Sequence, residues 1–256
     1  MSDTNRRTFD LNIERILEGW GVHHALREVI ANALDEQALT GTRDITIAKN
    51  SQRVWHIRDY GRGLKYEHLT QNENKEKLRN PNKVVGKFGV GLKDALATLY
   101  RRGADVTIRT KHGDIALQVA PKHGFADVKT LHAVICPPSD PNMVGTDFSF
   151  HKIGDSDIDE AKKFFLKFSG ETVLGSTTYG QILPRDAKGK ARIYVKGLFV
   201  AEEEEFAFSY NITALTAAMN RALNRERTNV GRTAYSDRVK DMLLASDSAD
   251  VARDSR

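Results

Sequence analysis

The chain has 256 residues, enough for one large domain or two modest ones. Hydrophobic residues make up 40% and charged residues 29%, a balance typical of globular proteins. The sequence contains no run of about 18 apolar residues, so it predicts no membrane-spanning helix. The net charge of +5 permits contact with nucleic acid or nucleotide but demands neither. The N-terminus lacks a signal peptide's apolar core, and the single cysteine, Cys136, excludes an internal disulfide, so we expect a cytoplasmic protein.

The first third of the chain predicts one long helix followed by a hairpin. Residues 1–10 are polar, so we expect either a loose segment or an interaction arm there. Apolar residues at helical spacing predict a helix from about His23 to Leu39, and Gly41 fits a stop just after it. Alternating apolar residues then predict two short strands, Asp44–Ala48 and Arg53–Arg58.

Three polar side chains share one face of the expected helix. Glu28, Asn32 and Asp35 are spaced i, i+4 and i+7, which places all three in one line. Two carboxylates and an amide in one line are suited to metal and water handling. The same pattern is typical of a solvated helix surface, so the helix alone leaves both interpretations open.

A carboxylate and two glycines directly follow the second expected strand, in the segment Asp59-Tyr60-Gly61-Arg62-Gly63-Leu64. The glycines allow a tight turn and the close approach of a flat ligand. Asp59 can accept a hydrogen bond from an exocyclic amine, as on adenine, although Asp and Gly are also ordinary turn residues. The next residues, Lys65–Lys83, are very polar and predict a long connection without regular pattern, which is usually functional or disordered.

A second glycine-rich segment reads Val84-Val85-Gly86-Lys87-Phe88-Gly89-Val90-Gly91-Leu92-Lys93. Its three glycines expose backbone N–H groups to an anion, beside the N-terminus of a helix expected over Leu92–Tyr100. Its lysines add positive charge. The segment is a phosphate cradle in chemical terms, but it is neither a Walker A loop nor a G-x-G-x-x-G dinucleotide fingerprint.

The remaining pattern predicts more strands of the same sheet and then a smaller group of elements. Expected strands are Val106–Thr110, Asp114–Val119, Val128–Ile135, Met143–Phe150, Thr177–Leu183, Ala191–Val200 and Phe206–Tyr210. Expected helices are Asp157–Phe168, with Ser156 or Asp157 as cap, Ile212 to about Arg227, and Ser236–Leu244.

The motifs occur in a set order that resembles the GHKL ATPase superfamily. Glu-x-x-x-Asn-Ala-x-Asp from Glu28 comes first, then Asp-x-Gly-x-Gly-Leu from Asp59, a polar loop, and Gly-x-Phe-Gly-x-Gly-x-Lys from Gly86. Gly145-Thr146 resembles the family's fourth element. The superfamily contains type II topoisomerase ATPase domains, ninety-kilodalton heat-shock chaperones, sensor histidine kinases and MutL proteins, with MORC ATPases as relatives. The chaperone, MutL and MORC-like branches are the nearest in layout.

The resemblance implies an α+β Bergerat fold, an α/β sandwich whose mixed, mainly antiparallel sheet has helices on one face. It implies ATP and Mg²⁺ as cofactors. By the same resemblance Glu28 is the general base that activates water, Asn32 is the Mg²⁺ ligand, and Asp35 supports the ribose and phosphate region. Asp59 is the adenine-reading carboxylate, and Thr146 contacts the same base region directly or through water.

The glycine-rich segments complete the pocket that the resemblance implies. Gly61, Gly63 and Leu64 shape the adenine pocket, and residues from about 65 to 91 form an ATP lid. The phosphate side is implied to involve Lys87, Phe88, Gly89, Val90, Gly91 and Lys93. In-line phosphoryl transfer needs such positioning, N–H donors and an oriented water.

We expect three regions: an ATP-binding domain over residues 1–170, a reduced transducer-like or helical extension over 171–245, and a flexible tail over 246–256. Lys196, Arg225 and Arg227 are candidate sensors of the γ-phosphate. Each also fits an ordinary structural role, as a solvated strand lysine or as the basic end of a helix.

The expected function is Mg-dependent ATP hydrolysis, with lid closure coupled to homodimerisation or partner action. Glu28 favours hydrolysis over histidine-kinase chemistry, because those kinases usually carry another polar residue there and a phosphoacceptor histidine upstream. His23 and His24 are interpreted as helix-surface residues. Two alternatives remain open, an ATP-gated interaction module with little turnover and a protein that acts on nucleic acid in repair or defence. No membrane partner is expected.

Overall fold

The computed structural model describes residues 6–11, 19–70, 75–80, 83–85, 90–223, 231–249 and 251. The chain divides into two compact units, Met1–Ala161 and Lys162–Arg256. Each unit has its own sheet, and each is described here by itself. None of the helices in the described ranges is long and apolar enough to cross a membrane.

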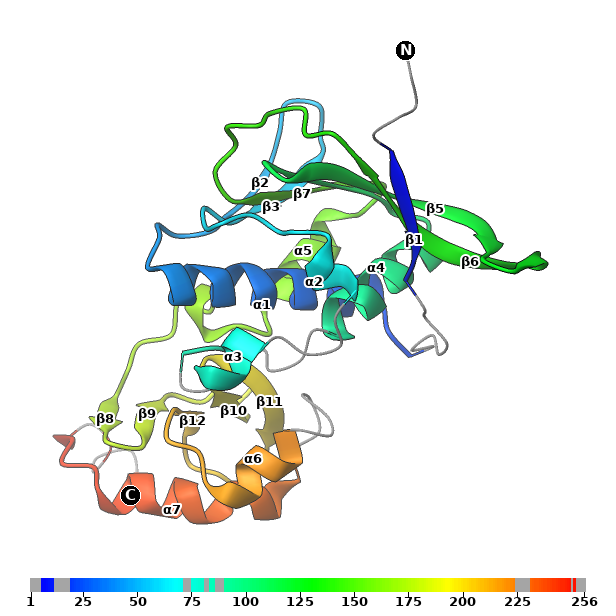
Figure 1. Ribbon diagram of the computed structural model, residues 1–256. Helices are drawn as coiled ribbons and strands as arrows, with labels where there is room; N and C mark the ends of the chain where they lie inside the picture. Colours follow the sequence, from blue (N-terminus) through cyan, green and yellow to red (C-terminus); the bar gives the residue numbers. More distant parts are fainter. Residues whose placement is uncertain are drawn as a thin grey trace. The chain divides into compact units, whose positions relative to one another are not determined.

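The first unit is built on a seven-stranded antiparallel sheet with the order β1-β6-β5-β4-β7-β3-β2 (Figure 1). Its strands are β1 (Arg7–Asp10), β2 (Thr46–Lys49), β3 (Trp55–Arg58), β4 (Asp105–Thr110), β5 (Gly113–Lys122), β6 (Phe125–Cys136) and β7 (Thr146–His151). The prediction of a loose segment over residues 1–10 is wrong for β1, which pairs with β6 at the edge of the sheet. The strand predicted from Met143 begins at Thr146, because Gly145 adopts a φ of 81° that extended backbone does not allow.

Two long helices, α1 (Val22–Thr40) and α4 (Val90–Arg101), pack against each other. Figure 1 shows both on the same side of the sheet. The core between helices and sheet is apolar, with fully buried side chains that include Leu26, Ile30, Ile57, Leu96, Ile108 and Phe150. The predicted helix stop is confirmed, since Gly41 adopts a left-handed φ of 66° and its N–H donates to the carbonyl of Gln37.

The polar stretch after β3 contains two short helices that its sequence pattern did not predict, α2 (Glu67–Thr70) and α3 (Lys75–Arg79). Single side chains in this stretch are buried, among them Leu69 and Lys77. The helix predicted over Asp157–Phe168 is shorter, α5 (Asp155–Lys162), and a 3₁₀ turn at Leu166–Phe168 follows it. Because α5 begins at Asp155, the predicted caps at Ser156 and Asp157 are wrong.

The second unit has a five-stranded sheet with the order β11-β10-β12-β9-β8, in which β10 and β12 run parallel. Its strands are β8 (Gly175–Thr177), β9 (Gly180–Leu183), β10 (Ala191–Val195), β11 (Leu198–Glu203) and β12 (Ser209–Ile212). Lys196 and Gly197, both with positive φ, separate β10 from β11, so the single strand predicted over Ala191–Val200 is wrong.

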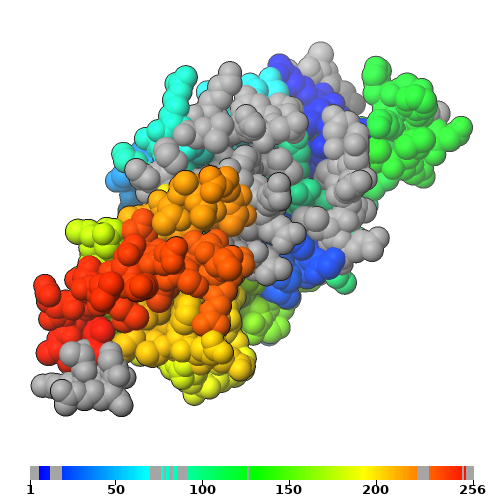
Figure 2. Space-filling view, turned by 90° about the horizontal axis from the view of Figure 1, so that it is seen from below, coloured from blue at the N-terminus to red at the C-terminus, as the bar shows by residue number. Residues whose placement is uncertain are grey.

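The described part of the second unit includes the helices α6 (Ala217–Leu223) and α7 (Ser236–Leu244). They lie side by side on its surface (Figure 2). The helix predicted from Ile212 begins only at Ala217, because Ile212 is the last residue of β12. The unit has its own core, formed by Ile182, Ile193, Val195, Val200, Phe208, Tyr210, Ile212, Met219, Tyr235, Val239, Met242 and Val251.

Candidate functional site

The predicted polar face of α1 is largely buried. Glu28 is 2% exposed and Asp35 is 1% exposed, and Asn32 is partly buried between them. The side-chain Nδ2 of Asn32 donates to the backbone carbonyl of Glu28 at 2.8 Å, which fixes the amide so that its Oδ1 is available to other donors. This face is therefore not a solvated surface.

Glu28 lies among charged groups contributed by α1 and α4. The Arg27 guanidinium donates to Glu28 Oε1 from Nη2 at 2.9 Å and from Nε at 3.1 Å, and it stacks over the Trp20 ring. Burial, together with the negative charge of Glu28, raises the pKa of Asp94 on α4, and Lys93 acts in the opposite direction. Charge at this end of α1 is thus dense and shielded from water.

The Asp59 carboxylate is buried at the end of β3. Its Oδ1 accepts the backbone N–H of Gly61 at 2.9 Å and that of Thr146 at 3.3 Å. The Asp59 N–H donates to the Thr146 carbonyl at 3.0 Å, so β7 holds this loop closely. Burial raises the pKa of Asp59, although the bonds from Gly61 and Thr146 act to lower it.

Two glycines permit the close approach between this loop and β7. A Cβ on Gly145 would lie 2.0 Å from the carbonyl oxygen of Asp59, and Gly145 has a φ of 81°. Gly63 has a φ of 86°, and the next residue, Leu64, donates its N–H to Thr146 Oγ1 at 3.0 Å. Only glycine meets both the conformation and the space at position 145.

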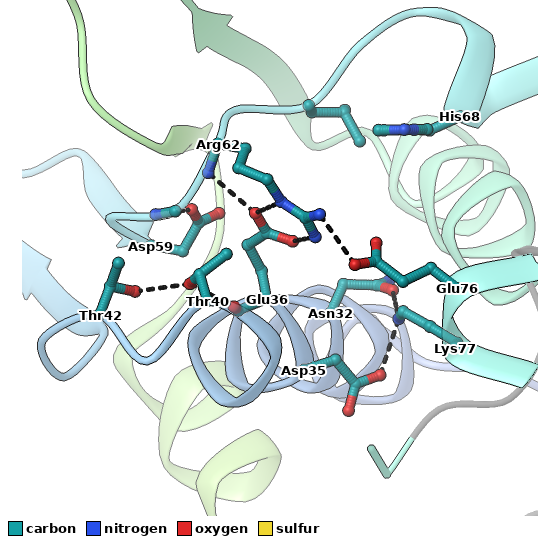
Figure 3. Close-up of polar contacts among 12 residues, drawn as sticks. Asn32, Asp35, Glu36, Thr40, Thr42, Asp59, Arg62, His68, Glu76 and Lys77 are labelled. Atoms are coloured by element: carbon teal, nitrogen blue, oxygen red, sulfur yellow. Dashed lines mark hydrogen bonds and ion pairs between the residues drawn. The ribbon is translucent and has the colours of Figure 1, made fainter. Parts of the chain in front are cut away.

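Glu36 and Arg62 join α1 to the Asp59 loop (Figure 3). Arg62 donates to Glu36 through its backbone N–H at 2.8 Å, its Nε at 2.9 Å and its Nη2 at 2.8 Å, and through Nη1 to Glu76 at 2.9 Å. Burial acts to raise the pKa of Glu36, but the bonds from Arg62 outweigh it and the pKa is lowered. A Cβ on Gly61 would lie 2.3 Å from the Glu36 side chain, so the loop contacts α1 directly.

The helix α3 contributes a buried lysine to the same place. Lys77 Nζ donates to Asn32 Oδ1 at 2.8 Å and to Asp35 Oδ2 at 2.7 Å (Figure 3). The backbone N–H of Val85 donates to the other oxygen of Asp35 at 2.6 Å. Asp35 therefore holds two separate parts of the segment between β3 and α4.

The predicted site residues meet in the first unit as far as the structure describes them. Val90, Gly91 and Lys93 form the start of α4, which packs on α1, and Lys93 is 9% exposed. Lys87, Phe88 and Gly89 lie outside the described residues, as do Arg225 and Arg227. Lys196 belongs to the second unit, in the turn between β10 and β11.

Sequence reasoning missed five charged residues of this site: Arg27, Glu36, Arg62, Glu76 and Lys77. Three of them, Arg27, Glu36 and Arg62, carried a signal, since each stands within or directly beside a recognised motif. The polar run that contains Glu76 and Lys77 carried none, because its many charged residues are alike in pattern.

The side-chain oxygen of Asn32 suits a magnesium ion that is held mainly by phosphate oxygens. In the described parts of the chain, no group of three or more His, Cys, Asp or Glu is placed to hold a metal. Mg²⁺ usually takes one or two protein oxygens and completes its shell with waters and phosphate oxygens. Asn32 Oδ1 already faces a cationic nitrogen, that of Lys77, so its position fits this role.

Comparison with known proteins agrees with this geometry. Residues 21–136 match the family model described as histidine kinase-, DNA gyrase B-, and HSP90-like ATPase, and residues 156–249 match the Mycoplasma pneumoniae MPN635 N-terminal domain. An uncharacterized protein of Mycoplasma pneumoniae is 37% identical over 247 residues, which cover 94% of this chain and 98% of that protein. A second uncharacterized protein of that organism is 27% identical over 111 residues, 43% of this chain and 32% of its own length. With α1, the Asp59 loop and the start of α4 all inside the first match, residues 21–136 of the chain belong to the histidine kinase-, DNA gyrase B-, and HSP90-like ATPase family.

Proposed function

We propose that the first unit binds ATP with Mg²⁺ and hydrolyses it. The observation that supports this most strongly is the convergence of the motifs on one helix. Helix α1 carries Glu28 and Asn32 on a buried face, and its later residue Glu36 holds the Asp59 loop through Arg62. One rigid element thereby sets the position of the proposed adenine end relative to the proposed phosphate end.

At the adenine end, Asp59 reads the exocyclic amine. The backbone N–H groups of Gly61 and Thr146 donate to Oδ1 of this carboxylate, and Oδ2 is the proposed acceptor for the ligand. Thr146 lies beside it, and Gly61 and Gly63 allow the flat base to approach the backbone. A site built around a buried acceptor discriminates strongly against a base that has no donor there.

At the phosphate end, Asn32 Oδ1 is the proposed ligand of Mg²⁺, which when bound neutralises phosphate charge. Glu28 orients the attacking water and accepts its proton on a carboxylate oxygen. Arg27 fixes the Glu28 carboxylate through Oε1. Asp35, Gly91 and Lys93 support the same end, from α1 and from the start of α4.

The segment from about residue 65 to 91 is the proposed ATP lid, and its closure is proposed to promote homodimerisation or partner action. The second unit is proposed to be a reduced transducer-like extension, with Lys196, Arg225 and Arg227 as its candidate γ-phosphate sensors. In this layout the chain stands nearest the chaperone, MutL and MORC-like branches of the family.

Equilibrium binding of a fluorescent ATP analogue and phosphate release test the proposal together. Glu28→Gln is expected to bind the analogue like wild type and to release phosphate about a hundredfold more slowly. Asp59→Asn is expected to lose binding, while the exposed carboxylate variant Asp159→Asn behaves as wild type. Equal phosphate release by wild type and Glu28→Gln would contradict the assignment of the base.

An ATP-gated interaction module is the alternative within the same site. Here nucleotide acts as a conformational switch, and turnover is slow. Three hydrogen bonds join the 65–91 segment to α1, from Lys77 to Asn32 and Asp35 and from the Val85 N–H to Asp35, and they favour a conformational response to nucleotide. Size-exclusion runs with and without a non-hydrolysable analogue test it, and an unchanged elution volume counts against both the switch and the dimer.

A charged concavity favours nucleic-acid binding as a second candidate function. A hollow of about 540 Å³ beside the Asp59 loop is lined by Thr42, Arg43, Arg58, Tyr60, Asp140, Asn142, Met143 and Val144. Arg43 and Arg58 both lie over the Tyr60 ring, at 3.6 Å and 5.2 Å from its centre. Arginines beside an aromatic ring suit a phosphate next to a stacked base.

A salt titration of DNA binding tests this candidate, since phosphate contacts give a steep dependence on salt. The double variant Arg43→Ala/Arg58→Ala is expected to weaken binding about tenfold and to reduce the salt slope. No binding by wild type at low salt removes the candidate.

A further inference from the structure

We infer that Lys77 is an internal cation which, in the nucleotide-free chain, occupies the place where Asn32 would hold Mg²⁺, and that it sets the magnesium requirement of the site. The inference rests on the proposed function and adds a regulatory contact to it. Lys77 must leave Asn32 before the metal-bound nucleotide is held.

The contact is short, buried and directed at two oxygens. Lys77 Nζ lies 2.8 Å from Asn32 Oδ1 and 2.7 Å from Asp35 Oδ2, and Lys77 is 8% exposed (Figure 3). An ammonium has three donors and no acceptor, so it makes the kind of contact with oxygen lone pairs that a hard metal cation makes. Lys77 therefore mimics a metal bound between an amide and a carboxylate.

Lys77 and a metal ion compete for one atom. The Asn32 Nδ2 group is bonded to the Glu28 carbonyl, which leaves the Oδ1 end of the amide as the metal-binding end. A magnesium ion on Oδ1 would lie within a few ångströms of Nζ, and two cations so close in a partly dry site repel strongly. The two occupants are mutually exclusive.

The same contact holds α3 against α1. A further described contact of α3, from Glu76 to Arg62, joins side chains that are 45% and 53% exposed, and exposed ion pairs contribute little. The Lys77 to Asp35 pair is buried, with side-chain exposures of 10% and 1%. Release of Lys77 by the metal would therefore remove a buried contact between α3 and α1.

A magnesium titration of analogue binding tests the inference, with the full chain and a fluorescent non-hydrolysable ATP analogue. Lys77→Met is expected to lower the Mg²⁺ concentration for half-maximal binding about tenfold, the factor given by loss of one charge-assisted hydrogen bond in the competing state. Lys77→Arg keeps the cation, although not the compact ammonium, and is expected to lower the Mg²⁺ concentration for half-maximal binding less than Lys77→Met does. If Lys77→Met does not fold, Lys77→Gln, which keeps a donor for Asp35, takes its place.

Two controls separate this role from a merely structural one. Glu76→Gln removes the exposed ion pair with Arg62, and Lys129→Met removes an exposed lysine of β6; both are expected to leave the magnesium requirement within about twofold of wild type. A second readout is thermal unfolding. Without ligand, Lys77→Met is expected to unfold at a lower temperature than wild type. The difference between the two unfolding temperatures is expected to become smaller when Mg²⁺ and the analogue are present.

An unchanged or raised magnesium requirement in Lys77→Met overturns the inference, and so does an equal fall in Glu76→Gln. Either result, with wild type binding the analogue, leaves the proposed ATP site standing. Absence of analogue binding by wild type and by every Lys77 variant, at any magnesium concentration, overturns the proposed function and the inference together.

Discussion

Arg27 and Glu28 are neighbours in the sequence and form a buried ion pair, with Nη2 of Arg27 2.9 Å from Oε1 of Glu28 and side-chain exposures of 3% and 2%. Both side chains project from the first half of α1. The Arg27 guanidinium therefore lies as a fixed positive charge beside the Glu28 carboxylate, which is proposed to activate water. A buried charge of this kind is stable only while its partner remains.

Arg27→Met is therefore expected to lower the free energy of unfolding by about 3 kcal/mol, since it leaves the Glu28 carboxylate buried without its main counter-charge. Arg27→Lys is expected to cost less. Urea denaturation measures both. The double variant Arg27→Met/Glu28→Gln is expected to recover part of the loss, because its two changes remove the pair together; strict additivity would show that the two residues do not interact.

Gly145→Ala is expected to destabilise the first unit by about 3 kcal/mol and to weaken nucleotide binding, because its Cβ would lie 2.0 Å from the Asp59 carbonyl oxygen. Gly103→Ala is the matched control. Gly103 has a similar φ of 78° with nothing within 4 Å of the added Cβ, so only the left-handed strain of about 1 kcal/mol remains. Equal losses for the two variants, in chemical denaturation, would refute a steric role for Gly145.

Asp59→Asn is expected to raise the midpoint of thermal unfolding at about pH 7, even though it abolishes binding. Burial raises the pKa of Asp59 in the folded chain above its ordinary value. The stability that this carboxyl contributes is therefore present in acid and is lost as the pH rises through the folded-state pKa. The gain from Asn is expected to shrink toward about pH 3, where wild-type Asp59 is protonated too.

The pKa of Asp155 is shifted in the opposite direction to that of Asp59, so Asp155 serves as the control for that experiment. The hydrogen bond from Lys49, with that from Trp55, lowers the pKa of Asp155. Asp155→Asn is therefore expected to lower the unfolding midpoint slightly at about pH 7, and the difference is expected to vanish in acid. The same pH trend in both variants would contradict the assignment for Asp59.

Leu11→Ala tests whether the N-terminal strand belongs to the fold. Leu11 follows β1, is 1% exposed, and its N–H donates to the Leu131 carbonyl at 3.0 Å. We expect a loss of about 3 kcal/mol in the free energy of unfolding. Val128→Ala, on an exposed side chain of β6, is expected to change it by less than about 0.5 kcal/mol.

Local pattern was sufficient to predict helices that are long enough to show a clear helical periodicity. The bounds of α7, Ser236–Leu244, agree with the prediction, and those of α1 differ from it by one residue at each end. Strand β1 was missed because four residues carry little periodicity, and its structure depends on pairing with β6 more than a hundred positions away. The short helices α2 and α3 were missed for a related reason, since a one-turn helix is stable only through tertiary contacts.

For the candidate site, the order of motifs identified the side chains but not their partners. Asp59 and Thr146 were predicted to serve the same region, and the structure places them in direct backbone contact. The contact between Lys77 and Asp35 was not predicted, because the two lie 42 positions apart and the sequence does not distinguish Lys77 from nearby lysines such as Lys75. Long charged side chains have no periodic signal that selects one partner.

Two consecutive residues of α3 carry opposite charges, and each contacts a partner of the opposite sign. Glu76 reaches the cation Arg62, and the next residue, Lys77, reaches the anion Asp35. A shift of α3 by one residue either way would bring Lys77 to Arg62 or Glu76 to Asp35, and like charges would then meet. The order of charges in the dipeptide Glu76-Lys77 therefore favours this register of the helix. Exchanging the two residues, which changes neither composition nor net charge, would oppose its docking at both contacts.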